Sequence, residues 1–183
     1  MMLPGKNKKY RRFVLFGLSV AIVLGLALGL TMQTAARDSW KCFCPYFKST
    51  QHGGVGGNAF SDDLTQVKGI TQIMVRSGTF VDAIAVTYLL TSGETITVNH
   101  GGIGGSPSII QLREGEYITR IDGRAGDFID QIAFRTNMGA IFGPFGGNGG
   151  NPFSIRDIRL GGFFGRSGDF IDAIGVFTAN REN

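Results

Sequence analysis

The chain has 183 residues, of which 29 are glycine, 17% are charged and 43% are apolar. This length allows one domain of ordinary size and a short extra segment, and the composition excludes a disordered or collagen-like chain. The formal net charge of +4 does not describe the domain, because residues 51–183 carry 10 basic and 13 acidic side chains. We therefore expect no basic face for nucleic acid.

Residues 1–36 have the features of an export signal. Five basic residues precede the uncharged run 13–30, which as a helix would span roughly 27 Å, close to the ~30 Å core of a bilayer. The basic residues predict a cytoplasmic N-terminus and export of everything that follows. Two outcomes stay open: a retained single-pass membrane anchor, or a signal peptide cleaved after residues 34–36, which would give a secreted protein.

Residues 37–51 are predicted to form a stalk. Its four aromatic residues would lie either at the membrane interface or against the domain. They are Trp40, Phe43, Tyr46 and Phe47. The stalk also contains both cysteines of the chain, Cys42 and Cys44, which are either plain thiols or a bridge between two chains of a homo-oligomer. We predict no metal site, because no cluster of histidine or cysteine accompanies this pair.

Residues 52–183 are predicted to form an all-β domain. Runs such as Thr-Ile-Thr-Val at 95–98 alternate in polarity and are separated by glycine-rich turns, which is typical of strands. No apolar period of helical spacing and length occurs in this region. The domain has no cysteine, so a scaffold held by disulfides is excluded.

Two motifs recur three times in the domain. GGxGG begins at residues 53, 101 and 146, and GxxxD begins at residues 78, 126 and 168. Each GxxxD follows its GGxGG by 25, 25 and 22 residues, which indicates an internal repeat. Apolar residues follow each aspartate after two and four positions, a spacing that places both on one face of a strand. They are Ile84, Val86, Ile132, Phe134, Ile174 and Val176. We predict three units of about four strands around a pseudo-threefold axis.

The repeated motifs suit the recognition of a sugar. Glycines let a ligand approach the main-chain N–H groups, and a carboxylate accepts hydrogen bonds from two adjacent hydroxyls. One such site would be weak, but three gain affinity by multivalency. The alternative is that the loops are only tight corners and each aspartate caps its own turn. The phenylalanines inside the turns would stack on a ligand or pack in the interior. They are Phe80, Phe128 and Phe170.

Other chemistries lack the residues that they need. The glycine loops open no helix, so a phosphate-binding loop is not predicted. His52 and His100 each directly precede a GGxGG loop, and we expect them to have structural roles. No Ser-His-Asp set is recognisable. We therefore predict that the chain is not an enzyme and has no catalytic residue, metal or cofactor.

With these motifs, and with the stretch from Phe134 through Phe145 into the third glycine loop, residues 52–183 resemble the jacalin-related lectins. The resemblance implies an all-β β-prism of three four-stranded Greek-key sheets. It also implies binding of mannose- or glucose-type glycans or glycoproteins, because a continuous stalk precedes the first loop instead of the free N-terminus of galactose-specific members. The alternative is a β-prism that binds protein partners and little sugar.

The resemblance implies that each sugar lies between an aspartate and the last glycine of a loop. The implied pairs are Asp82 with Gly105, Asp130 with Gly150, and Asp172 with Gly57. Main-chain N–H groups of the turns would complete the sites. These groups belong to Thr79, Phe80, Asp127, Phe128, Asp169 and Phe170. A threefold-symmetric member of the family carries tyrosine at the phenylalanine positions, so we expect each site to be weakened by the missing hydroxyl.

Overall fold

The computed structural model describes residues 46–179. The predicted export segment 1–36, with its apolar run 13–30, lies outside the described residues, as do Trp40, Cys42 and Cys44. Among the residues that are described, no helix is long and apolar enough to cross a membrane.

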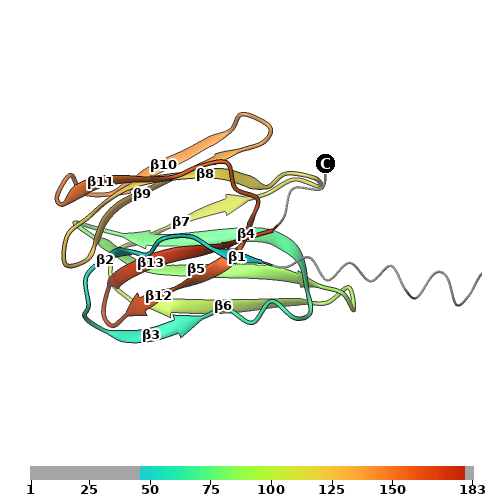
Figure 1. Cartoon of the computed structure of the whole chain (residues 1–183), viewed down its shortest axis with the longest axis horizontal. Coiled ribbons are helices and arrows are strands. Elements are labelled where there is room, and N and C mark those ends of the chain that lie inside the picture. Colours follow the sequence, from blue (N-terminus) through green and yellow to red (C-terminus); the bar gives the residue numbers. More distant parts are fainter. Residues whose placement is uncertain (1–45, 180–183) are drawn as a thin grey trace, which may run out of the picture. The chain divides into compact units, whose positions relative to one another are not determined.

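All strands of the described region belong to three sheets (Figure 1). The first sheet contains β1 (Phe47–Lys48), β2 (His52–Gly53), β3 (Asn58–Ser61), β12 (Leu160–Ser167) and β13 (Ile171–Thr178). The second contains β4 (Val67–Ser77), β5 (Val81–Leu90), β6 (Thr95–Gly101) and β7 (Ser106–Gln111). The third contains β8 (Ile118–Ala125), β9 (Ile129–Thr136), β10 (Ile141–Gly146) and β11 (Asn151–Ile155). The all-β prediction is confirmed for these residues.

Each sheet has Greek-key order. In the second sheet β4, β5 and β6 are neighbours in sequence and in space, and β7 returns to pair with the outer side of β4. The third sheet repeats this order as β10-β9-β8-β11. The first sheet joins the two ends of the described chain, because β12 and β13 pair with β1, β2 and β3. It has five strands where four were expected, since its edge strand is split into β1 and β2.

The end of the predicted stalk belongs to the first sheet. Phe47 pairs with Thr178 and Lys48 with Phe177. The Tyr46 ring lies so close to Gly161 that a Cβ there would be 2.3 Å from Tyr46 Cε1. Tyr46 therefore packs on the domain, which was one of the two alternatives, whereas Phe47 joins the sheet through its main chain and its side chain is 53% exposed.

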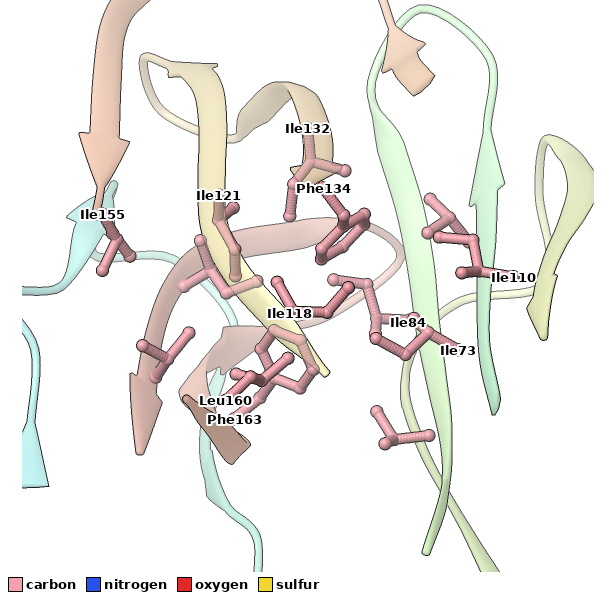
Figure 2. Close-up of a cluster of buried hydrophobic side chains, with 14 of the residues drawn as sticks. Ile73, Ile84, Ile110, Ile118, Ile121, Ile132, Phe134, Ile155, Leu160 and Phe163 are labelled. Atoms are coloured by element: carbon pink, nitrogen blue, oxygen red, sulfur yellow. The ribbon is translucent and has the colours of Figure 1, made fainter. Parts of the chain in front are cut away.

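The inner faces of the three sheets enclose one apolar core. Figure 2 shows Ile84 from β5, Phe134 from β9 and Phe163 from β12 pointing toward one another. The six residues that the sequence placed two and four positions after the repeated aspartates are at most 2% exposed, as predicted. Burying each such side chain stabilises the fold by about 1.5–3 kcal/mol. This core fixes the inner strands, and with them the turns that carry the aspartates.

Candidate functional site

The Greek-key order brings each GGxGG loop to the GxxxD turn of its own sheet. In the second sheet the turn joins β4 to β5, and the loop crosses from edge strand β6 to edge strand β7. Gly101 pairs with Ala83, and Ser106 pairs with Ser77, so both ends of the loop start beside the turn. The equivalent pairs in the other sheets are Gly53 with Ala173, Asn58 with Ser167, Gly146 with Gln131, and Asn151 with Ala125. In Figure 1 the β2–β3 and β10–β11 loops and the β8–β9 and β12–β13 turns lie at the left end.

The structure brings together each aspartate and glycine that the resemblance paired. A Cβ on Gly105 would lie 2.5 Å from Asp82 Oδ2. The corresponding distances are 2.4 Å between Gly150 and Asp130 Oδ2, and 2.5 Å between Gly57 and Asp172 Oδ2. Asp172 and Gly57 meet because the first sheet is built from both ends of the described chain. The three carboxylates thus lie against three loops at one end of the domain.

Glycine is required where the carboxylate contacts the loop. Gly105 has a φ of +61°, a conformation that side chains disfavour. At the preceding Gly104, a Cβ would lie 2.3 Å from Asp82 Oδ1. The main chain of Gly104 and Gly105, the last two glycines of the loop, therefore contacts both carboxylate oxygens directly. A ligand held by the carboxylate would lie beside bare peptide groups of the loop.

The three carboxylates are buried, and two of them have an oxygen without a hydrogen-bond partner. Asp82, Asp130 and Asp172 are 6%, 7% and 5% exposed. Among the described residues, Oδ2 of Asp82 and Oδ2 of Asp172 are buried without a hydrogen-bond partner. A buried acceptor without a partner costs about 1–3 kcal/mol. These two oxygens keep an unused capacity to accept a hydrogen bond.

Main-chain hydrogen bonds fix each loop to its aspartate. The second glycine of each loop donates its N–H to the carbonyl of the paired aspartate. The bonds are Gly102 to Asp82 at 3.0 Å, Gly54 to Asp172 at 2.9 Å and Gly147 to Asp130 at 2.8 Å. Each turn is closed by an N–H bond from its glycine to the phenylalanine carbonyl two residues later, at 3.0 Å in all three copies. The local geometry is thus repeated as closely as the sequence.

A repeated arginine, which the sequence motifs did not identify, completes each site. Arg76 donates from Nε to the Gly104 carbonyl at 2.7 Å and from Nη2 to the Gly105 carbonyl at 2.8 Å. Arg124 makes the same two bonds to Gly149 and Gly150, and Arg166 to Gly56 and Gly57, all between 2.6 and 2.7 Å. The signal was present, because each arginine stands two residues before the glycine of GxxxD. Two bonds from one planar guanidinium fix the orientation of both peptide groups.

The three phenylalanines of the turns pack on one another. Their ring centroids are 5.2–5.4 Å apart, with interplanar angles of 56–67°. These are favourable tilted and edge-to-face geometries. Phe80, Phe128 and Phe170 are half-buried, while Thr79, Asp127 and Asp169 beside them are exposed. The rings thus pack on one another at half-buried positions, and this aromatic cluster connects the three turns.

Both histidines have structural contacts. The His52 ring stacks on Phe153 with centroids 4.5 Å apart, and burial lowers the pKa of His52. The His100 ring stacks on Phe60 at 3.8 Å, and its Nε2 lies 2.7 Å from Oδ1 of Asp62. Within residues 46–179, no group of three or more His, Cys, Asp or Glu residues could hold a metal ion.

Comparison with known proteins gives a consistent set of relatives. Residues 49–177 match the jacalin-like lectin domain family. Griffithsin from Griffithsia sp. (strain Q66D336) is 37% identical over 139 residues, which cover 68% of this chain and 91% of griffithsin.

Solved structures agree with this assignment. Wild-type Malaysian banana lectin has a TM-score of 0.68 and 38% identity, covering 74% of this chain and 100% of that chain. AcmJRL, a mannose-binding jacalin-related lectin from Ananas comosus, has a TM-score of 0.67 and 31% identity, covering 72% of this chain and 96% of that chain. The resemblance to the jacalin-related lectins that was inferred from the motifs is confirmed. All of these relatives are lectins, in agreement with the prediction that the chain is not an enzyme.

Proposed function

Because the chain belongs to the jacalin-like lectin family, we propose that it binds mannose- or glucose-type glycans at three similar sites at one end of its β-prism. The observation that carries the proposal is the buried, unpartnered Oδ2 of Asp82 and of Asp172 beside a glycine loop. In each site the carboxylate accepts from two sugar hydroxyls, and main-chain N–H groups of the turn donate to sugar oxygens. The similarity to AcmJRL, a mannose-binding jacalin-related lectin, supports mannose as the class of sugar.

Each residue of the site has a separate task in this mechanism. The aspartate recognises a pair of hydroxyls, and the last glycine leaves room for the sugar ring. The arginine holds the loop peptides in place without contacting the sugar. The phenylalanine packs in the aromatic cluster and supplies its N–H group. Without a phenolic hydroxyl in the turn, each site is weak, and useful affinity arises from glycans that engage several sites at once.

The decisive experiment is calorimetric titration of the full-length chain with mannose and with a branched mannose oligosaccharide. We expect weak binding of mannose and tighter binding of the branched ligand. The triple variant Asp82→Asn, Asp130→Asn, Asp172→Asn should bind neither ligand. The exposed Asp63→Asn serves as the matched control and should bind both. Binding that persists in the triple variant overturns the proposal, and circular dichroism verifies that each variant is folded. A wild-type chain that binds neither sugar favours the alternative of a protein-binding prism.

We also propose that residues 1–36 export the domain and either anchor it to a membrane or are removed. The strand order supports a tether that leaves the sites free. Phe47 pairs with Thr178, whereas the turn containing Asp172 lies at the other end of β13. The chain therefore enters the domain at the end opposite the three sites. N-terminal sequencing of the mature protein and membrane fractionation distinguish an anchored from a secreted form.

Oligomerisation through Cys42 and Cys44 is part of the same proposal. A disulfide between two stalks would double the number of sites in one particle. Electrophoresis with and without reducing agent tests this, and a Cys42→Ser, Cys44→Ser variant should run as a single chain in both.

A further inference from the structure

The three proposed sites differ at the tips of their loops. The middle residue of GGxGG is Val55 in the first loop, Ile103 in the second and Asn148 in the third. Val55 is 91% exposed and Ile103 is 93% exposed. Two loops therefore present a nearly bare branched aliphatic side chain, and the third presents an amide.

Each tip residue lies beside the carboxylate of its site. Ile103 directly precedes Gly104, where a Cβ would lie 2.3 Å from Asp82 Oδ1. Val55 directly precedes Gly56, where a Cβ would lie 2.3 Å from Asp172 Oδ1. Since consecutive Cα atoms are about 3.8 Å apart, each tip lies one residue from the glycine that contacts the carboxylate. We expect a sugar on either carboxylate to come within reach of the neighbouring tip.

The third loop is also held differently. Gln131 Nε2 donates to the Gly147 carbonyl at 2.8 Å and to Oδ1 of Asn148 at 3.0 Å. The residues equivalent to Gln131 in the other two repeats are Ala83 and Ala173, which have no side-chain donor. The polar tip of the third loop is thus fixed by a glutamine that the other two repeats lack.

From these differences we propose that the sites of Asp82 and Asp172 prefer saccharides with a methyl-bearing substituent, whereas the site of Asp130 does not. The inference rests on the proposed lectin function and specifies the ligand class of each site. The exposed Val55 and Ile103 side chains contribute little to folding, because they bury little surface. A ligand methyl group that covers them removes apolar surface from water, which corresponds to about a fourfold gain in affinity per methyl group. The fixed amide of Asn148 offers no such surface and favours a bare hydroxyl group.

The test is a titration of the isotopically labelled full-length chain, followed by nuclear magnetic resonance at the amides of Gly57, Gly105 and Gly150. Each amide reports one site, and the probes are mannose and methyl α-mannoside. At each site we divide the affinity for methyl α-mannoside by the affinity for mannose. Comparing this ratio between sites cancels any effect of fixing the anomer. The ratio should be about two- to fivefold higher at Gly57 and Gly105 than at Gly150.

Two reciprocal variants make the test specific. Ile103→Asn should lower the ratio at Gly105 and leave it unchanged at Gly57. Asn148→Val should raise the ratio at Gly150. Equal ratios at all three sites, or ratios that ignore both variants, would overturn the inference while leaving the lectin function intact. Absence of any mannoside response at the three glycines would instead overturn the proposed function itself.

Discussion

The guanidinium group of Arg166 donates to the carbonyl oxygen of Gly57, 109 residues earlier in the chain, at 2.7 Å. The same group also donates to Gly56, so one side chain joins the last repeat to the first loop. This contact closes the first sheet at the end where the proposed sugar sites lie.

Replacing this arginine should weaken one site. We expect Arg166→Gln to lower sugar affinity at the Gly57 site about tenfold and the free energy of unfolding by about 1 kcal/mol, because the loop loses two charge-assisted hydrogen bonds. Arg166→Lys should recover part of the affinity, since an ammonium group cannot reproduce the planar pair of donors. Amide shifts of Gly57 and Gly105 during titration measure the effect. An equal loss of affinity at both sites would contradict a local role of Arg166. The control is Arg159→Gln, which removes a cation–π contact with Tyr117.

Adding a single methyl group to the loop should also disrupt a site. In Gly105→Ala the new Cβ would lie 2.5 Å from Asp82 Oδ2 at a φ of +61°. We expect a loss of about 2–4 kcal/mol in the free energy of unfolding and no binding at that site. Gly69→Ala is the matched control, because nothing lies within 4 Å of its Cβ position. Urea denaturation compares the free energies of unfolding of the two variants. Equal values would show that the close approach of Gly105 to Asp82 does not contribute to stability.

The aromatic cluster should stabilise the arrangement of the three turns. Phe128→Ala removes two ring contacts, with Phe80 and with Phe170. We expect the free energy of unfolding to fall by about 2–4 kcal/mol, since each aromatic pair is worth about 0.5–1.5 kcal/mol beyond the buried area. Phe47→Ala, at a residue that is 53% exposed, should cost much less. A Phe128→Ala variant as stable as the wild type would mean that the turns are held by their main chain alone.

A buried polar group should contribute separately to stability. The Tyr88 hydroxyl donates to Oδ2 of Asp62, which also accepts the Phe163 N–H at 2.8 Å. Burial and the nearby carboxylate of Asp62 raise the pKa of Tyr88, which therefore stays a donor. Tyr88→Phe should lower the free energy of unfolding by about 1–3 kcal/mol, as for other buried acceptors that lose a partner. Chemical denaturation of this variant and of Tyr117→Phe tests whether the buried hydroxyl is responsible.

The pH dependence of stability should depend in part on Asp122. Burial raises the pKa of Asp122, but hydrogen bonds from Arg120 and Ser154 outweigh burial and hold it below its usual value of 3.8. Because the folded state binds this proton less readily than the unfolded state, the stabilisation is complete above that value. It is lost as the pH falls through the lower, folded pKa. The melting temperatures of wild type and Asp122→Asn should therefore differ at pH 6, and the difference should begin to shrink only below about pH 4. A difference that stays constant over this range would exclude ionisation as its cause.

The sequence by itself determined the repeat, the all-β class and the inner strand faces. These features depend on short spacings, so Ile84 and Ile132 could be placed in the core from their distance to an aspartate. The motifs identified Asp82, Asp130 and Asp172, and the resemblance to a known family supplied their glycine partners. The arginines also carried a signal, since each precedes its turn by two residues, but their hydrogen bonds could not be read from spacing.

Only the tertiary structure decided which contacts form between distant segments. The carbonyls that Arg166 holds lie 109 and 110 residues away, and their orientation depends on the glycine φ angles of a loop in another part of the chain. The rings of Phe80, Phe128 and Phe170 meet because three sheets turn toward one axis. Asp62 bonds to groups 26, 38 and 101 residues away, and it occurs in only one repeat. A periodic sequence predicts the strands and turns within each repeat, whereas the packing of the repeats decides what their side chains contact.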